Sequence, residues 1–139
     1  METLRKKNNS SLSIALSDCY PTILIVNLRY SALFMQADST IQKQIKKVIQ
    51  ETDDTAIAIL YGSRAKGTAR EDSDWDILIL LNKPLVTLKD EQRFRHKLYD
   101  VELAIGQPIS TFVYSLQDWN TRLSVTPLYQ NIQREGLIL

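Results

Sequence analysis

The chain has 139 residues, of which 44% are hydrophobic and 24% are charged. These fractions are ordinary for a globular protein, and the length suits one compact domain. The formal net charge of +1 gives no electrostatic reason to expect nucleic acid or a membrane surface as the main partner. The one cysteine, Cys19, excludes a disulfide within the chain and fits a reducing compartment.

The first 37 residues differ from the rest. A basic cluster at 5–7 precedes an apolar stretch, as in a signal peptide, but Asp18 and Pro21 interrupt that stretch and no clean small-residue cleavage site follows. No apolar run approaches the roughly 20 residues of a membrane span. We therefore expect a cytoplasmic protein. Residues 1–37 are expected to be an N-terminal extension: a short strand and helix, a packed arm or a loose segment. Residues 38–139 are expected to form the functional domain.

Several stretches after residue 37 carry helix signals. A capping box places Ser or Thr three residues before an acid or amide, and the two side chains satisfy the free N–H groups at a helix start. This spacing occurs at Ser39/Gln42, Thr87/Asp90 and Ser115/Asp118. Gly106 is expected to end the second of these helices, and Thr126-Pro127 and Gly136 to delimit the last one.

Three apolar runs have the length of strands: Ala56–Tyr61, Trp75–Leu81 and Ile109–Tyr114. The first has no polar side, which is typical of a strand covered on both faces. With the helices and the piece after Tyr61, the element order is α-β-α-β-α-β-α-α. We therefore predict an α/β (α+β) layer fold with a small mixed sheet flanked by helices.

The segment after the first predicted strand indicates phosphate binding. Gly62 lets the backbone turn sharply and approach a ligand closely. If a helix begins there, its free N–H groups point to the same place, which favours phosphate. Ser63 adds a hydroxyl donor, and Lys66 and Arg70 can neutralise further phosphate charge.

Asp74 and Asp76 lie two residues apart at the second predicted strand. Side chains alternate along a strand, so both carboxylates leave the same face, about 6.6 Å apart. Carboxylates this close repel each other and need a cation between them. Oxygen ligands of this kind suit Mg²⁺, which is usually held by one or two carboxylates together with substrate phosphates. We predict that Asp74 and Asp76 are the metal ligands and catalytic residues.

Gly62-Ser63, ten further residues, and then Asp74-Trp75-Asp76 resemble the hallmark of the minimal nucleotidyltransferases of the DNA polymerase β superfamily. The resemblance extends to the element order from about Ser39 to about Ser115. It implies a palm-like nucleotidyltransferase fold and transfer of NMP from a Mg²⁺-bound nucleoside triphosphate, ATP first among them, to a hydroxyl. The residues it places around the nucleotide are Gly62, Ser63, Arg64, Lys66, Arg70 and Ser73.

The resemblance also bears on partners. Many small members of this superfamily are encoded beside a helical HEPN-type protein as a toxin–antitoxin pair, and some modify that partner with AMP. A lone domain of this size has no obvious acceptor-binding domain, so the acceptor site is expected on a partner protein or across a homodimer. The base, the acceptor and the oligomeric state stay open.

One departure from the superfamily pattern leaves two hypotheses about the function. The usual third carboxylate, on the next core strand, aligns with Ser110, or with Thr111 if the register slips, and neither is acidic. Glu102 is a substitute if the preceding helix end points inward. The sequence therefore predicts either a metal-dependent nucleotidyltransferase or a nucleotide-binding or partner-binding module of the same fold with little turnover.

Overall fold

The computed structural model describes residues 20–139 of the chain. The basic cluster at 5–7, Asp18 and Cys19 lie outside the described residues. The chain divides into two compact units, residues 1–37 and residues 38–139, and each is described by itself. None of the described helices is long and apolar enough to cross a membrane.

Helix α1 runs from Tyr20 to Thr52 and enters both units. The prediction that a helix begins at the Ser39 capping box is therefore wrong. A capping box marks a start only where the preceding residues leave the helical conformation. Here the preceding residues include good helix formers such as Ala32, Leu33 and Met35, so the backbone continues through the box. Pro21 lies in the first turn, where its missing N–H is tolerated.

The sheet belongs to the second unit and has four strands, in the order β3-β2-β1-β4. Their bounds are Ile57–Tyr61 for β1, Trp75–Leu81 for β2, Ile109–Ser115 for β3 and Leu137–Ile138 for β4. β1 runs antiparallel to β2 and β4, while β3 runs parallel to β2, so the predicted mixed sheet is confirmed. The two residues of β4 were not predicted, because so short a segment shows no alternation.

The helices between the strands are α2 at Gly62–Ala65, α3 at Leu88–Ile105, α4 at Leu116–Asn120 and α5 at Pro127–Glu135. The predicted ends are confirmed. Thr87 and Asp90 form a full capping box before α3, and Gly106 ends that helix in the left-handed conformation, with φ 68°. The side chains of Ser115 and Thr126 cap α4 and α5.

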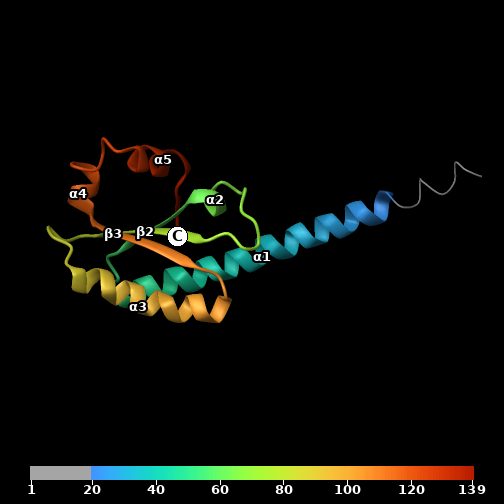
Figure 1. Cartoon of the computed structure of the whole chain (residues 1–139), viewed down its shortest axis with the longest axis horizontal. Coiled ribbons are helices and arrows are strands. Elements are labelled where there is room, and N and C mark those ends of the chain that lie inside the picture. The colour runs from blue at the N-terminus through green and yellow to red at the C-terminus, as the bar shows by residue number, and fades with distance from the viewer. Residues whose placement is uncertain (1–19) are drawn as a thin grey trace, which may run out of the picture. The chain divides into compact units, whose positions relative to one another are not determined.

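The two faces of the sheet are covered by different helices (Figure 1). On the α3 face, β2 buries Trp75, Ile77, Ile79 and Leu81 against α3 and the last turns of α1. On the α5 face, Leu78 and Leu80 pack with Trp119 of α4 and Ile132 of α5. Because side chains alternate along a strand, Asp76 belongs to the α5 face.

Candidate active site

A row of three polar side chains crosses the α5 face where β1 ends and β2 begins. The strand register pairs Asp76 with Tyr61 of β1 on one side and with Ser110 of β3 on the other. Residues paired across neighbouring strands point to the same face of a sheet, so the three side chains share one side. The apolar packing of this face gives way here to groups that can bind polar ligands.

Gly62 and Asp76 are in direct contact at one end of this row. Gly62 has φ +72°, in the left-handed region that glycine adopts readily. A Cβ atom built on Gly62 would lie 2.2 Å from Oδ2 of Asp76, so a larger residue here would have to displace the carboxylate. The glycine therefore does two things: it turns the chain out of β1, and it leaves room for the carboxylate against the backbone.

Asp76 is the carboxylate whose protonation the site perturbs. Burial raises its pKa above the ordinary value, and the charge of Asp74 raises it further. Asp74 is exposed and lies one residue before β2, so it is placed just off the strand rather than on it. The effect of one carboxylate on the other indicates that they are close enough to repel. Such a pair favours a cation, which would relieve the repulsion.

Asp74 and Asp76 fit Mg²⁺ by their chemistry. Both present hard carboxylate oxygens, and Mg²⁺ commonly takes one or two carboxylates and fills its other positions with water and phosphate oxygens. Within residues 20–139, no cluster of three or more His, Cys, Asp or Glu residues is arranged to hold a metal by itself. A cation bound here would therefore need oxygens from a ligand as well.

The turn after Gly62 supplies donors beside the carboxylates. α2 is a single turn, so the N–H groups of its first residues have no helical acceptor. In the described part of the chain the Ser63 hydroxyl makes no hydrogen bond, and it is free to donate. Lys66 Nζ lies 2.8 Å from Oε2 of Glu135 at the end of α5. This ion pair is partly exposed, so Lys66 can exchange Glu135 for another anion.

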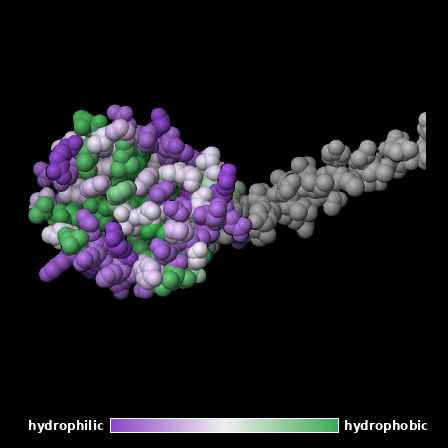
Figure 2. Space-filling view, viewed as in Figure 1, coloured by the Kyte–Doolittle hydropathy of each residue, from purple (hydrophilic) through white to green (hydrophobic). Residues whose placement is uncertain are grey.

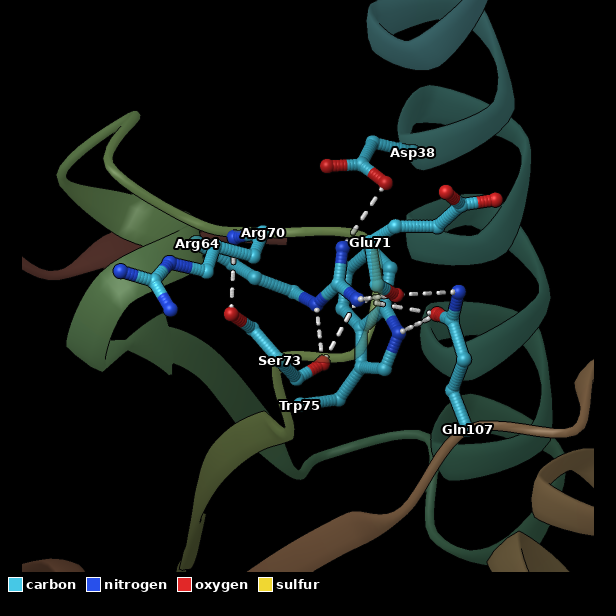
Figure 3. Close-up of polar contacts among 7 residues, drawn as sticks. All are labelled: Asp38, Arg64, Arg70, Glu71, Ser73, Trp75 and Gln107. Carbon is cyan, nitrogen blue, oxygen red and sulfur yellow. Dashed lines mark hydrogen bonds and ion pairs between the residues drawn. The ribbon is translucent and has the colours of Figure 1, made fainter.

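The side chain of Arg64 makes contacts inside the protein and does not join these donors (Figure 3). Its side chain is fully buried, with the guanidinium 4.2 Å above the ring of Trp75. It donates to the carbonyl of Ser73 at 2.6 and 3.0 Å and to Oε1 of Gln107 at 3.0 Å. A 2.9 Å ion pair joins it to Asp38 of α1. Arg64 therefore ties the loop to the α3 face, and its placement does not support contact with a nucleotide.

Ser73 and Arg70 hold the loop in shape. The Ser73 hydroxyl accepts the backbone N–H of Arg70 at 2.8 Å, and the Ser73 carbonyl accepts Arg64. The side chain of Arg70 is exposed and points away from the guanidinium of Arg64 (Figure 3). Arg70 is thus able to meet a ligand, whereas Ser73 has a defined internal acceptor role.

The register resolves the question of the third carboxylate position. Ser110 is the residue of β3 paired with Asp76, whereas Thr111 is paired with Ile77 and shares the α3 face. Glu102 cannot take this place: its Oε2 accepts the N–H of Ile109 at 3.0 Å, and it belongs to the helix on the opposite side of the sheet. A hydroxyl therefore stands beside Asp76.

The sequence did not reveal the far wall of the site. A pocket of about 150 Å³ adjoins Gly62, and α5 contributes Asn131, Ile132 and Glu135 to its lining. Tyr61 lines it too; burial and the neighbouring Asp76 charge raise the Tyr61 pKa to about 12, so this phenol stays protonated at neutral pH. α5 follows the motif by more than fifty residues, and no local pattern signals that it returns to Gly62.

Three solved structures are similar to this chain. A solved structure of a candidate minimal nucleotidyltransferase has 24% identity, covers 73% of this chain and 94% of its own, and superposes with a TM-score of 0.50. A toxin–antitoxin crystal structure with AMP-PNP has 21% identity, 69% coverage of both chains and a TM-score of 0.49. A mutant MntA–HpeT toxin–antitoxin has 20% identity, 70% coverage of both chains and a TM-score of 0.48.

No curated protein matches the chain. At 24% identity, the structure with a TM-score of 0.50 shows a shared fold alone. The sequence family described as "Polymerase beta, Nucleotidyltransferase" matches residues 43–137, which include β1, β2, β3 and the whole motif from Gly62 to Asp76, and which end at the first residue of β4. The chain therefore belongs to the polymerase β nucleotidyltransferase family.

Proposed function

We propose that this protein binds a Mg²⁺–nucleoside triphosphate, ATP by preference, at Gly62, Ser63, Asp74 and Asp76, and transfers its NMP group to a hydroxyl. The observation that carries the proposal is the contact between Gly62 and Asp76: a Cβ on the glycine would lie 2.2 Å from the carboxylate. The turn that offers phosphate donors and the carboxylate that offers cation ligands are thus built against each other.

Each residue has a distinct task in this proposal. Asp74 and Asp76 hold the cation, whose charge would offset that of the triphosphate while the α-phosphorus is attacked. The backbone of the α2 turn and the Ser63 hydroxyl donate to phosphate oxygens. Lys66 leaves Glu135 and neutralises part of the phosphate charge, since phosphate offers a stronger anionic partner than one carboxylate.

The transfer step requires a proton acceptor. The hydroxyl oxygen of the acceptor forms a bond to the α-phosphorus, the bond to the pyrophosphate oxygen breaks, and pyrophosphate leaves. The hydroxyl proton must go to a base, and a positioned base contributes roughly 10²–10⁴-fold in rate. Ser110, the neighbour of Asp76 on β3, is not a base at neutral pH. In this proposal the acceptor molecule or water takes the proton, and we propose a HEPN-type partner protein as the acceptor.

A second candidate function is favoured by the same residue. With Ser110 in register with Asp76 and Glu102 on the other side of the sheet, the chain is suited to bind nucleotide with little turnover. In that case it acts as a nucleotide-dependent binding module for its partner. The two candidates share the nucleotide site and differ only in the rate of transfer.

Binding tests the shared part of the proposal. Titration calorimetry with ATP and Mg²⁺ is expected to show binding that Asp76→Asn abolishes and Asp74→Asn weakens. Asp72→Asn removes the same charge from the same loop at an exposed position and serves as the matched control. Unchanged affinity in the two site variants, or equal loss in the control, would exclude this site.

Turnover separates the two candidates. The protein is incubated with α-labelled ATP, Mg²⁺ and the product of the neighbouring gene, and labelled protein is measured. The wild type is expected to transfer slowly, and Ser110→Asp to accelerate transfer, because it restores a carboxylate beside Asp76. Thr111→Asp, on the other face, is the control and is expected to give no gain. No transfer by any variant that still binds ATP supports the binding module.

A further inference from the structure

Strand β3 forms an open edge of the sheet, and its composition is unusual for an edge. It pairs with β2 on one side and is last in the strand order. Its seven residues, Ile109–Ser115, include no charged residue and no proline. Edge strands are normally protected by such residues or by being very short, as β4 is with two residues. β3 therefore has the features of a strand that pairs with another chain.

The backbone groups that point outward follow from one hydrogen bond. The N–H of Trp75 donates to the carbonyl of Pro108 at 2.8 Å. In a parallel ladder this fixes an alternation in which every second residue of β3 bonds to β2 and the others point away. The outward set is Ile109, Thr111, Val113 and Ser115, and the Ile109 N–H is already accepted by Glu102. In residues 20–139 the outward groups of Thr111 and Val113 meet no partner.

The surface beside this edge is open. A hollow of about 190 Å³ runs along it, lined by Glu91 and Arg95 of α3 and by the stretch 111–114. Phe112 is 45% exposed, although its ring stacks on Tyr114 within the strand. In Figure 2, apolar side chains are visible among hydrophilic ones in the middle of the folded domain, the part of the view that β3 crosses in Figure 1.

We propose that β3 pairs antiparallel with β3 of a second copy, about a two-fold axis at Phe112, to form a homodimer with one continuous sheet. In this register Thr111 lies opposite the partner's Val113, and Val113 opposite the partner's Thr111. All four residues have outward backbone groups, so each pair exchanges both of its hydrogen bonds. A register centred on Phe112 thus gives hydrogen-bond partners to the outward backbone groups of Thr111 and Val113 in both copies.

Side chains on both faces of the sheet fit the same axis. Phe112 meets the partner's Phe112 in a non-hydrogen-bonded pair, where Cα atoms approach to about 4.5 Å and aromatic rings interact well. The two-fold axis also reverses the direction of α3. Glu91 and Arg95, one helical turn apart along the hollow, then face the partner's Arg95 and the partner's Glu91, opposite in charge. This complementarity selects a second copy rather than an unrelated strand.

Sedimentation of the full chain tests the assembly. The wild type is expected to dimerise with a Kd in the micromolar range, and Phe112→Lys to be monomeric with unchanged circular dichroism. Val125→Lys, at an apolar residue that is 80% exposed elsewhere, is the control and is expected to remain dimeric. A wild type that stays monomeric, or equal weakening by both lysines, overturns the proposal. A wild type that stays monomeric and binds a different protein through β3 would also overturn the proposal.

Cross-linking tests the register independently of affinity. In a Cys19→Ser background, Phe112→Cys is expected to form a disulfide-linked dimer, since the expected Cα separation of about 4.5 Å lies in the disulfide range. Leu85→Cys, at a residue that is 69% exposed, should not. Glu91→Arg should weaken the dimer and Glu91→Arg with Arg95→Glu should restore it. Equal cross-linking at both cysteines, or no recovery in the charge-swapped pair, counts against this interface.

Discussion

Arg64 and Asp76 stand in one short stretch of sequence and lie on opposite sides of the sheet. Arg64 is fully buried against Trp75 and has all its contacts within the protein. Asp76 shares the α5 face with Ser110, and its pKa is raised because burial and Asp74 disfavour its charge. The charge of Arg64 is satisfied and holds the fold, whereas the carboxylate of Asp76 has no hydrogen-bond or ion-pair partner within residues 20–139. Charged residues of one short motif can therefore have opposite environments, one buried and paired and the other without a partner.

The largest expected effect is a loss of stability on substitution of Arg64. Arg64→Ala removes the buried partner of Asp38 and leaves the carbonyl of Ser73 without its donor. Loss of one member of a buried ion pair typically destabilises by about 3–5 kcal/mol. Urea unfolding would measure this, with Arg70→Ala in the same loop as the exposed control, expected within about 0.5 kcal/mol of wild type. Similar midpoints for the two variants would mean that the Arg64 contacts are not stabilising.

Gly62→Ala is expected to lower both the stability of the protein and its affinity for nucleotide. The substitution places a side chain at φ +72° and drives its Cβ into Asp76, so stability should fall by roughly 1–3 kcal/mol and nucleotide binding should be lost. Gly67→Ala is a matched control, because Gly67 has φ +71° and nothing within 4 Å of its Cβ position. The difference between the two variants isolates the clash from the backbone strain. Equal unfolding midpoints would show that Asp76 moves aside freely.

Asp76→Asn should act in the opposite direction to Arg64→Ala, raising stability at neutral pH. The folded pKa lies above the ordinary 3.8, so the folded protein binds this proton more tightly than the unfolded chain. The penalty of the charged form is fully present above the folded pKa and disappears as pH falls through it toward 3.8. The stability advantage of the variant over wild type should therefore shrink over that window. A difference that does not change with pH would contradict the assigned cause.

The smallest expected effect concerns Lys66. Its ion pair with Glu135 is partly exposed, and such pairs contribute at most about 1 kcal/mol to stability. Lys66→Gln should leave the unfolding midpoint nearly unchanged and raise the Kd for Mg²⁺–ATP by about tenfold at low salt, equivalent to about 1.4 kcal/mol. Lys47→Gln, on an exposed pair with Glu51, is the control. Equal affinities of the two variants would remove Lys66 from the phosphate contacts.

The caps of α3, α4 and α5 and the face of Asp76 were predictable because their signals are local. Strand alternation placed Trp75 and Asp76 on opposite faces, and the caps at Thr87 and Gly106 fixed the ends of α3. The task of Arg64 was not predictable, because an arginine in a phosphate-binding motif has the right charge for either role. Only Asp38 and Gln107, which are distant in sequence, distinguish the two.

Long-range contacts also explain the other differences. α1 continues through the capping box at Ser39, because the residues before it are themselves good helix formers. β4 exists because the chain after α5 returns to β1, where Leu137 pairs with Leu60. The continuation of a helix through a capping box and a two-residue strand have no periodic pattern in the sequence by which they could be predicted.

The anchoring of the 62–76 loop by Arg64 has a thermodynamic consequence for any ligand. Fixing the backbone of a fluctuating loop opposes binding by roughly 1–2 kcal/mol of entropy for each residue ordered. Here the Ser73 carbonyl is already held from the inner side of the loop, so a ligand on the outer side meets donors that are ordered in advance. An anchor loosened by Arg64→Lys would leave every ligand contact in place and make the binding entropy less favourable.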